Sequence, residues 1–278
     1  MNFTKMHGLG NDFVLVCQVQ APSQTEMSTL ARKMCDRHLG VGADGLVAVY
    51  PSASADVAMR IFNSDGTLAE QCGNAMRCVA RYYYERISSE KTEFAIETKV
   101  GVQPVWIIEE RGKVKQVRVD MGKPVLVPKQ IPVLAAGELA VNKVIRANDK
   151  TFRFSAVSMG NPHAVIEVNE AEKFPVDVWG PLLESHEIFP QKANIEFVTY
   201  HSPQEVTMRV WERGVGQTMA CGSGACATVV AGFLSGRCGR KVLVHLPGGD
   251  LMVEWDEQDQ HVYMTGPAEF VFDGAWLS

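Results

Sequence analysis

Short runs of β-branched and aromatic residues dominate the chain, and almost every run is bounded by Gly, Pro, Asn, Asp or Ser. Such runs are typical of β-strands separated by tight turns. In the first half, the pattern predicts strands at residues 13–17, 46–50, 57–62, 93–98, 103–108 and 114–121. In the second half, it predicts strands at residues 152–158, 164–168, 195–200, 206–211, 242–246, 251–255 and 262–265, with Gly248-Gly249 as a hairpin turn.

Three stretches have the pattern of helices instead. A peripheral helix is expected at residues 28–37, where Ser28 can cap the first turn. The other two lie at residues 75–86 and 225–234, and the second of these has no charged residue on any face. A helix that is apolar all round has to be enclosed by other elements. We therefore expect a sheet to curve around it.

The chain also repeats itself at a fixed spacing. Arg60-Ile-Phe leads to Cys72-Gly, and Arg209-Val-Trp leads to Cys221-Gly in the same way, so both pairs lie 149 residues apart. Further pairs fall at almost the same spacing: Gly10-Asn11 with Gly160-Asn161, and Gly45 with Asn194. The repeat predicts that the two halves share one plan and that each contributes a Cys-Gly at the same structural place.

Length and repeat together predict an α+β fold of two pseudo-symmetric lobes. A chain of 278 residues is long enough for two domains of ordinary size, each with its own core. We expect residues 1–121 to form the first lobe and residues 122–265 the second, with a strand at residues 268–272 returning residues 266–278 to the first. Each lobe is expected to be a curved, barrel-like mixed sheet around one buried helix, with the active site in the cleft between the lobes.

Composition narrows the class of partner. The net charge is −5 and the 27 basic residues are scattered, which argues against nucleic-acid binding. The seven cysteines include no CxxC pair, no His/Cys spacing matches a metal site, and the N-terminus lacks a secretory pattern. No uninterrupted apolar run is long enough to span a membrane. We expect a reduced, cytoplasmic protein that binds a small molecule and no metal.

The two Cys-Gly pairs are the strongest chemical signal. A thiol just before a helix lies beside unsatisfied N–H groups and the positive end of the helix dipole, which favours the thiolate. Such placement can lower a cysteine pKa from about 8.5 to roughly 3.5–7.5. The Gly after each Cys lets a bound carboxylate approach the same N–H groups. Two such thiols on opposite faces of one α-carbon can invert it without a cofactor.

At these residues the chain resembles the diaminopimelate epimerase family over its whole length. The resemblance rests on six motifs in the family's order: Met6-His-Gly-Leu-Gly-Asn-Asp-Phe13, Arg60-Ile-Phe-Asn-Ser-Asp-Gly66, Cys72-Gly-Asn74, Val157-Ser-Met-Gly-Asn-Pro-His163, Trp211-Glu-Arg-Gly214 and Ala220-Cys-Gly-Ser-Gly-Ala-Cys226. It implies a cofactor-independent interconversion of LL- and meso-2,6-diaminopimelate, in lysine and peptidoglycan synthesis, by an enzyme that is a homodimer.

The resemblance also implies roles for individual residues. Cys72 and Cys221 match the two acid/base residues, and His163 and Glu212 match those that tune the two sulfurs. The implied substrate-binding residues are Asn11, Asn63, Gly73, Asn74, Asn161, Asn194, Glu212, Arg213, Gly222 and Ser223. Two positions depart from some members: Gly45 replaces a Gln, and Phe272 replaces a Tyr at the dimer contact, so a ring is kept and a hydroxyl is lost.

Two other functions remain open at this point. A related two-cysteine racemase would act on proline or hydroxyproline, although Arg213 and Asn63 argue against its smaller pocket with a single carboxylate. A thiol-switch protein would instead join Cys72 and Cys221 in a regulatory disulfide and catalyse nothing. The remaining cysteines are expected to be structural, because each lies in or beside an apolar run: Cys17, Cys35, Cys78, Cys226 and Cys238.

Overall fold

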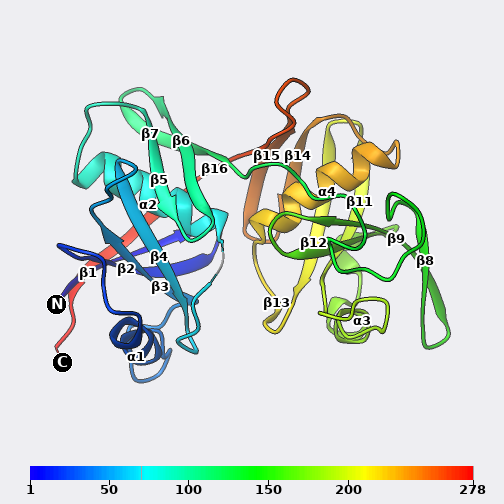
Figure 1. The fold of residues 1–278 in the computed structure, drawn as a ribbon, viewed down its shortest axis with the longest axis horizontal. Helices are drawn as coiled ribbons and strands as arrows, with labels where there is room; N and C mark the ends of the chain where they lie inside the picture. The colour runs from blue at the N-terminus through cyan, green and yellow to red at the C-terminus, as the bar shows by residue number, and fades with distance from the viewer. Residues whose placement is uncertain (70, 278) are drawn as a thin grey trace. The chain divides into compact units, whose positions relative to one another are not determined.

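The computed structural model describes residues 1–69 and 71–277, and the chain divides into two compact units. Unit 1 comprises Met1–Asp120 and the segment that starts at Thr265, and unit 2 comprises Met121–Met264. Both units combine strands with few helices, so the predicted α+β class is confirmed (Figure 1).

In unit 1, a mixed sheet lies against the helix α2 (Gly73–Arg86). β2 pairs with β3 and β4 with β5 in parallel, while β1–β2, β3–β4, β5–β6, β6–β7 and β1–β17 are antiparallel. The shorter helix α1 (Gln24–Met34) contacts β3 and β4. The strands are β1 (Asn2–Gly8), β2 (Asn11–Cys17), β3 (Gly45–Tyr50), β4 (Val57–Asn63), β5 (Glu93–Thr98), β6 (Gly101–Glu110), β7 (Lys113–Asp120) and β17 (Glu269–Ala275).

Unit 2 follows the same plan around the helix α4 (Gly222–Leu234), which contacts β9, β10 and β15. β10–β11 and β12–β14 are parallel pairs, and β8–β9, β9–β10, β11–β12 and β14–β15 are antiparallel. The other elements are β8 (Lys143–Ala147), β9 (Lys150–Ser158), β10 (Pro162–Glu167), η1 (Ala171–Lys173), α3 (Val176–Glu184), β11 (Asn194–Ser202), β12 (Glu205–Glu212), β13 (Gly216–Gln217), β14 (Lys241–Leu246), β15 (Gly249–Trp255) and β16 (Val262–Gly266).

The central helices are buried as their composition demands. In α4, Gly224 and every residue from Ala225 to Gly232 are buried, so the expected enclosure of this apolar helix is confirmed. Each Val buried there stabilises the fold by roughly 1.5–3 kcal/mol. In α2, burial runs from Gly73 to Ala80, and the helix then emerges with polar residues at its end.

The sequence repeat is also a repeat of strand register. Phe13 on β2 is paired with Gly45 on β3, and His163 on β10 is paired with Asn194 on β11, in the same parallel arrangement. The next strands agree as well, since Leu46 pairs with Phe62 and Ile195 with Trp211. The positions on β2, β3 and β4 therefore have structural counterparts on β10, β11 and β12, 149 or 150 residues further along the chain.

Several predicted boundaries were wrong. The peripheral helix begins at Gln24, not at Ser28, because the extended backbone that precedes it belongs to Ser23. The hairpin between β14 and β15 turns at Pro247-Gly248, since Gly249 already pairs with Leu246. The strand predicted at residues 268–272 is β17, and it pairs antiparallel with β1.

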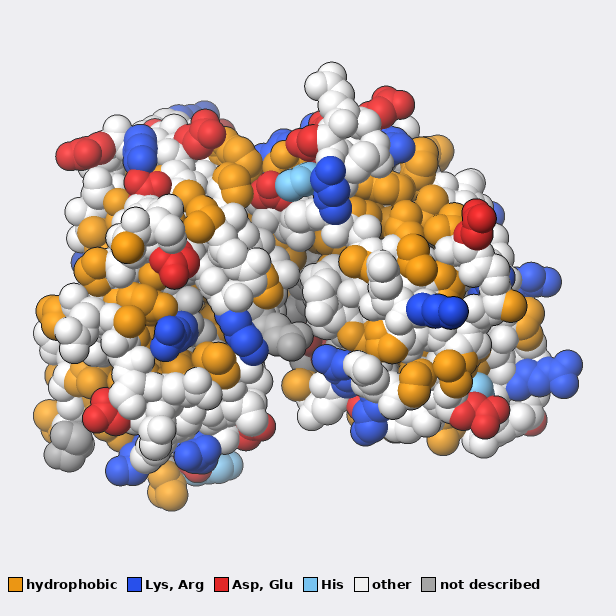
Figure 2. Space-filling model, in the orientation of Figure 1, with side chains coloured by type: hydrophobic (Ala, Val, Ile, Leu, Met, Phe, Trp, Pro, Cys, Tyr) orange, Lys and Arg blue, Asp and Glu red, His pale blue; other side chains and the backbone are white. Residues whose placement is uncertain are grey.

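Charged side chains are scattered over the surface, as they are along the sequence. On the face in Figure 2, acidic and basic side chains are interspersed over both units. Within the described residues, no helix has the length and apolar character needed to cross a membrane.

Candidate active site

Both cysteines of the repeat occupy the position directly before a central helix. The backbone of Cys72 (φ −148°, ψ 107°) is extended ahead of α2, and that of Cys221 (φ −116°, ψ 106°) is extended ahead of α4. The sulfur of Cys221 accepts a hydrogen bond from the backbone N–H of Gly224 at 3.4 Å. Each thiol therefore lies at the end of a helix where backbone N–H groups lack intrahelical partners, as predicted.

In unit 1, the side-chain amide of Asn11 lies beside the thiol of Cys72. The Oδ1 atom of Asn11 lies 3.7 Å from the sulfur and accepts a hydrogen bond from Asn74 Nδ2 at 3.0 Å. The Nδ2 atom of Asn11 donates to Asp44 at 2.7 Å. Asp44 thereby orients the Asn11 amide so that its oxygen faces Cys72.

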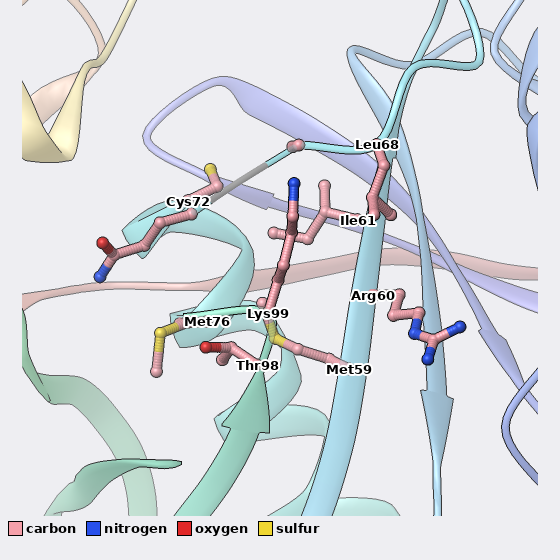
Figure 3. Close-up of a pocket in the computed structure, with 10 residues that line it drawn as sticks. Met59, Arg60, Ile61, Leu68, Cys72, Met76, Thr98 and Lys99 are labelled. Atoms are coloured by element: carbon pink, nitrogen blue, oxygen red, sulfur yellow. The ribbon is translucent and has the colours of Figure 1, made fainter. Parts of the chain in front are cut away.

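The floor of this thiol site is largely apolar. A pocket beside Cys72 is lined by Ile61 and Leu68 together with Met76, one turn along α2. Figure 3 shows Cys72 at the start of α2 and the long side chain of Lys99 extending from the end of β5 past Ile61. Lys99 is exposed, and Arg60 is a second basic residue that lines this pocket.

Two further residues of unit 1 lie near the strand and helix ends. Gly73 is buried as the first residue of α2. Asn63 is exposed at the end of β4 and donates to the hydroxyl of Thr67 at 2.9 Å, so its amide serves the following turn. Phe272 is half exposed on β17, and its ring contacts that of Phe3 edge-on at 5.9 Å.

In unit 2, acidic residues surround the thiol of Cys221. The side chain is buried, with 3% of its surface exposed, and its sulfur lies 3.6 Å from the hydroxyl of Ser223. Burial, and then the charges of Glu212 and Glu196, raise the pKa of Cys221 well above its ordinary value. The expectation that the helix start lowers this pKa was wrong, because desolvation and two carboxylates outweigh the helix dipole.

Glu212 is itself deeply buried. Burial raises the pKa of its carboxyl group, and hydrogen bonds from Thr218 and Cys221 together with the nearby His163 reduce that shift. Thr218 donates to Glu212 through its hydroxyl. The carboxylate and the thiol therefore share one enclosed site.

His163 lies between Glu196 and Asn161 at the edge of this site. Its Nδ1 atom lies 2.6 Å from Glu196 Oε1, and its Nε2 atom lies 2.8 Å from Asn161 Oδ1. Both His163 and Glu196 are fully buried. The sequence analysis missed Glu196, although a single charged residue inside the otherwise apolar run Ile195–Val198 was a usable signal.

Arg213 lies in the turn that follows β12, and hydrogen bonds to Asn194, Glu184 and the carbonyl of Gln191 hold this turn. Asn194 Oδ1 accepts from the backbone N–H of Arg213 at 2.9 Å, while Asn194 Nδ2 donates to the carbonyl of Pro162 at 3.0 Å. Glu184, at the end of α3, accepts from Gly214 N at 3.0 Å and from the indole of Trp211 at 2.8 Å. The guanidinium of Arg213 remains near the surface and donates to the Gln191 carbonyl at 3.2 Å.

Apart from Asn63 and the expected dimer contact Phe272, the expected residues form two groups, one in each unit. In unit 1 the structure brings together Asn11, Cys72 and Asn74, with Gly73 between the last two. In unit 2 it brings together Asn161, His163, Asn194, Glu212, Arg213, Cys221, Gly222 and Ser223.

Comparison with known proteins gives consistent matches. The family model described as diaminopimelate epimerase matches residues 3–127 and 155–271. A relative from Pelotomaculum thermopropionicum, named diaminopimelate epimerase, is 52% identical over 277 residues and covers 99% of both chains. One of the same name from Desulfitobacterium hafniense is 50% identical over 279 residues, with 100% of this chain and 98% of the relative covered.

Solved structures with lower identity share the fold. A phenazine biosynthesis protein of the PhzF family from Bacillus anthracis superposes with a TM-score of 0.72 at 19% identity, covering 100% of this chain and 99% of its own. A hydroxyproline epimerase from Agrobacterium vitis, with bound trans-4-hydroxy-L-proline, superposes with a TM-score of 0.72 at 15% identity, covering 99% and 91%.

Proposed function

Because the chain belongs to the diaminopimelate epimerase family, we propose that the thiols of Cys72 and Cys221 are its two acid/base groups. The protein is an amino-acid epimerase that interconverts LL- and meso-2,6-diaminopimelate. The observation that supports the role of the thiols is their position: each precedes the central helix of its unit, at corresponding places in the repeat.

The proposed reaction is a proton exchange at one α-carbon. One sulfur, as thiolate, removes the α-proton, and the electron pair of the broken C–H bond is left on the α-carbon and its carboxylate. The other sulfur, as thiol, delivers its proton to the opposite face, so a new C–H bond forms with inverted configuration. The raised pKa of Cys221 supports its protonated form as the starting donor. Backbone N–H groups at a helix start stabilise the charge that develops on the carboxylate.

The substrate carries two carboxylates and two ammonium groups, which suits the proposed binding residues. Asn side chains serve both kinds of group, since the amide donates through nitrogen and accepts through oxygen. Arg213 suits the distal carboxylate through two charge-assisted hydrogen bonds. The other proposed binding residues are Asn11, Asn63, Gly73, Asn74, Asn161, Asn194, Glu212, Gly222 and Ser223, and His163 and Glu212 tune the sulfurs.

The wider setting is proposed with the reaction. We propose a cytoplasmic homodimer that needs no cofactor and supplies meso-diaminopimelate for lysine and peptidoglycan synthesis. The identity of about 50% to relatives named diaminopimelate epimerase supports this setting.

Deuterium exchange tests the proposal directly. In heavy water the protein should incorporate deuterium at the α-carbon of diaminopimelate, and Cys72→Ala and Cys221→Ala should each abolish inversion. Cys78→Ala and Cys226→Ala are matched controls, because both cysteines are fully buried inside the same helices and should affect stability more than chemistry. Normal turnover in either of the first two variants would exclude the two-thiol reaction. Efficient racemisation of proline, or a Cys72–Cys221 disulfide with no exchange, would favour the two rival functions.

A further inference from the structure

The second thiol site contains a buried polar pair that the first site lacks. Through the repeat, His163 corresponds to Phe13 and Glu196 corresponds to Val47. Phe13 and Val47 are apolar and almost fully buried, and His163 and Glu196 are fully buried in the same places. The fold therefore does not require polar residues there, since its other half forms the same strands without them.

Burying this pair is unfavourable in itself. A sealed carboxylate is costly unless its oxygens are hydrogen-bonded. Oε1 of Glu196 contacts His163 Nδ1 at 2.6 Å, but among the residues that the structure describes no group hydrogen-bonds Oε2. Replacing a buried ion pair by well-packed apolar residues is often neutral or stabilising, so stability alone does not account for this pair.

Glu196 decides which nitrogen of His163 carries a proton. An ionised carboxylate only accepts hydrogen bonds, so the nitrogen facing it, Nδ1, must be the donor. The other nitrogen, Nε2, lies 2.8 Å from Asn161 Oδ1, and when Nε2 carries no proton the Asn161 amide has to turn its Nδ2 group toward the ring to donate to it. In the neutral ring, the carboxylate thus leaves Nε2 as the unprotonated nitrogen.

Glu196 also lies close to the reactive sulfur. A Cβ atom placed on Gly224 would stand 2.8 Å from Glu196 Oε1 and 3.2 Å from Cys221 Sγ, so both atoms crowd the same side of this glycine. The charge of Glu196 acts on the sulfur from β11, and Glu212 acts on it from β12. His163 lies on β10 and its charge acts on Glu212, while Ser223 contacts the sulfur from α4. Two negative charges therefore oppose ionisation of this thiol.

We infer that Glu196 is a positioning residue of the second thiol site: it holds His163 with its proton on Nδ1 and keeps Cys221 in the thiol form that donates to substrate. The inference rests on the proposed two-thiol reaction for its catalytic part. The orientation of His163 and the protonation of Cys221 belong to the free protein and are measurable without substrate.

Two substitutions test the inference. Glu196→Gln keeps the size of the side chain and removes the charge, and Glu196→Asp keeps the charge. Glu167→Gln is the matched control. Glu167 lies on the same strand as His163, β10, but its side chain is 43% exposed and forms an ion pair with Arg237. Circular dichroism and the unfolding midpoint establish that each variant is folded.

The first measurement uses the free protein. With ¹⁵N-labelled histidine, His163 should show its proton on Nδ1 in the wild type, in Glu196→Asp and in the control, and should lose that preference in Glu196→Gln. With ¹³Cβ-labelled cysteine, the Cys221 signal should ionise at lower pH in Glu196→Gln than in the wild type. An unchanged His163 tautomer in Glu196→Gln overturns the inference, whatever the protein does with diaminopimelate.

The second measurement is kinetic. Glu196→Gln should lower kcat at least tenfold while KM changes by less than about twofold, and Glu196→Asp should recover part of that loss. The limb of the rate profile that reports Cys221 should move to lower pH in Glu196→Gln. Kinetics equal to those of Glu167→Gln would also overturn the inference. Failure of the wild type to invert diaminopimelate would refute the proposed function instead, and the spectra of the free protein would still decide the role of Glu196.

Discussion

Hydrogen bonds hold both the nitrogen and the oxygen of the Asn11 side-chain amide, so the oxygen is the atom that faces the thiol of Cys72. Its nitrogen donates to Asp44 at 2.7 Å, and its oxygen accepts from Asn74 at 3.0 Å on the side of Cys72. Asp12 lies next to this pair and is bound by Lys5 at 2.6 Å and by Arg37 at 2.8 Å. Asp12 and Asp44, with the cations that bind them, therefore couple the stability of unit 1 to the geometry of this site.

The charge network makes one stability prediction. Burial alone would raise the pKa of Asp12, but hydrogen bonds and charge from Arg37 and Lys5 outweigh it and hold the pKa at about 2, against an ordinary 3.8. A depressed folded pKa contributes stability that is present above the unfolded value and is lost as pH falls through the folded value. Because Arg37 is largely exposed, the effect is discounted for solvent screening, and Asp12→Asn should lower the free energy of unfolding by about 1–2 kcal/mol at pH 7.

Urea unfolding across pH checks this prediction. The difference between wild type and Asp12→Asn should stay constant from pH 7 to about pH 5 and narrow below about pH 4. Asp149→Asn removes a charge from the exposed turn between β8 and β9 and should change the free energy of unfolding by less than about 0.5 kcal/mol. If the loss of unfolding free energy in Asp12→Asn did not depend on pH, the ion pairs of Asp12 with Lys5 and Arg37 would not be its source.

Arg213 provides a test of substrate chemistry. Arg213→Lys keeps the positive charge but loses the fork of donors that fits a carboxylate. Catalytic efficiency for diaminopimelate should fall at least tenfold, or about 1.4 kcal/mol of transition-state binding. Steady-state kinetics measure it, with proline as a compound that neither form should turn over. An unchanged efficiency would remove Arg213 from the carboxylate-binding role.

At the scale of elements, the short helix α3 supports the turn that presents Arg213. Glu184 at its end binds both Trp211 and Gly214, and Gly180 packs directly on the Trp211 ring. The sequence did not predict this helix, because Gly180 and Pro181 in its middle are the residues that usually end one. Packing against Trp211 and the two hydrogen bonds of Glu184 outweigh that local preference.

The helix contact makes a prediction of its own. A Cβ atom on Gly180 would lie 2.4 Å from Trp211 Cγ, so Gly180→Ala should destabilise the protein by about 1–3 kcal/mol. Gly239→Ala is the control, since the nearest atom to its Cβ would be the Pro203 carbonyl at 3.4 Å. Denaturant unfolding followed by tryptophan fluorescence compares the two, and equal stabilities would mean that α3 moves away from Trp211 at little cost.

The elements that carry the thiols were easier to predict than the ones that support them. The runs at residues 75–86 and 225–234 are helical and buried, as expected, although both helices begin earlier, directly after Cys72 and Cys221. The strand β1 was missed because Thr4 and Lys5 are buried in it, which breaks the expected alternation of apolar and polar residues. Local patterns identify elements whose burial is apolar, and they miss elements whose burial is satisfied by specific hydrogen bonds.

At the scale of the whole molecule, the repeat predicted the fold class and the positions of both thiols, and the resemblance supplied the candidate residues. Neither predicted that the surroundings of the thiols differ. The repeat aligns Glu196 with Val47, which is not charged. A search for identical residues at matched positions of the two halves therefore does not find Glu196. The pKa of Cys221 depends on residues brought together from two strands and a helix, which no local pattern specifies.

The proposed homodimer gives the last prediction. Phe272 and Val271 expose about half of their side chains on β17, at 48% and 53%. If this strand forms the dimer contact, Phe272→Asp should convert a dimer to a monomer, because a charge would be buried without a partner. Val144→Asp places the same charge at an equally exposed apolar position, 51%, on β8 and should leave the mass unchanged. Sedimentation velocity distinguishes the two outcomes.

The unlike pairs Phe13–Val47 and His163–Glu196 have a consequence for how such a chain evolves. An ancestor made of two separate copies of one half would carry the same residues beside both sulfurs, and every change beside one would appear beside the other. Joining the copies into one polypeptide removes that constraint. Selection can then alter the residues around one thiol alone. The two halves keep the same architecture, while one thiol becomes suited to donate a proton and the other to accept one.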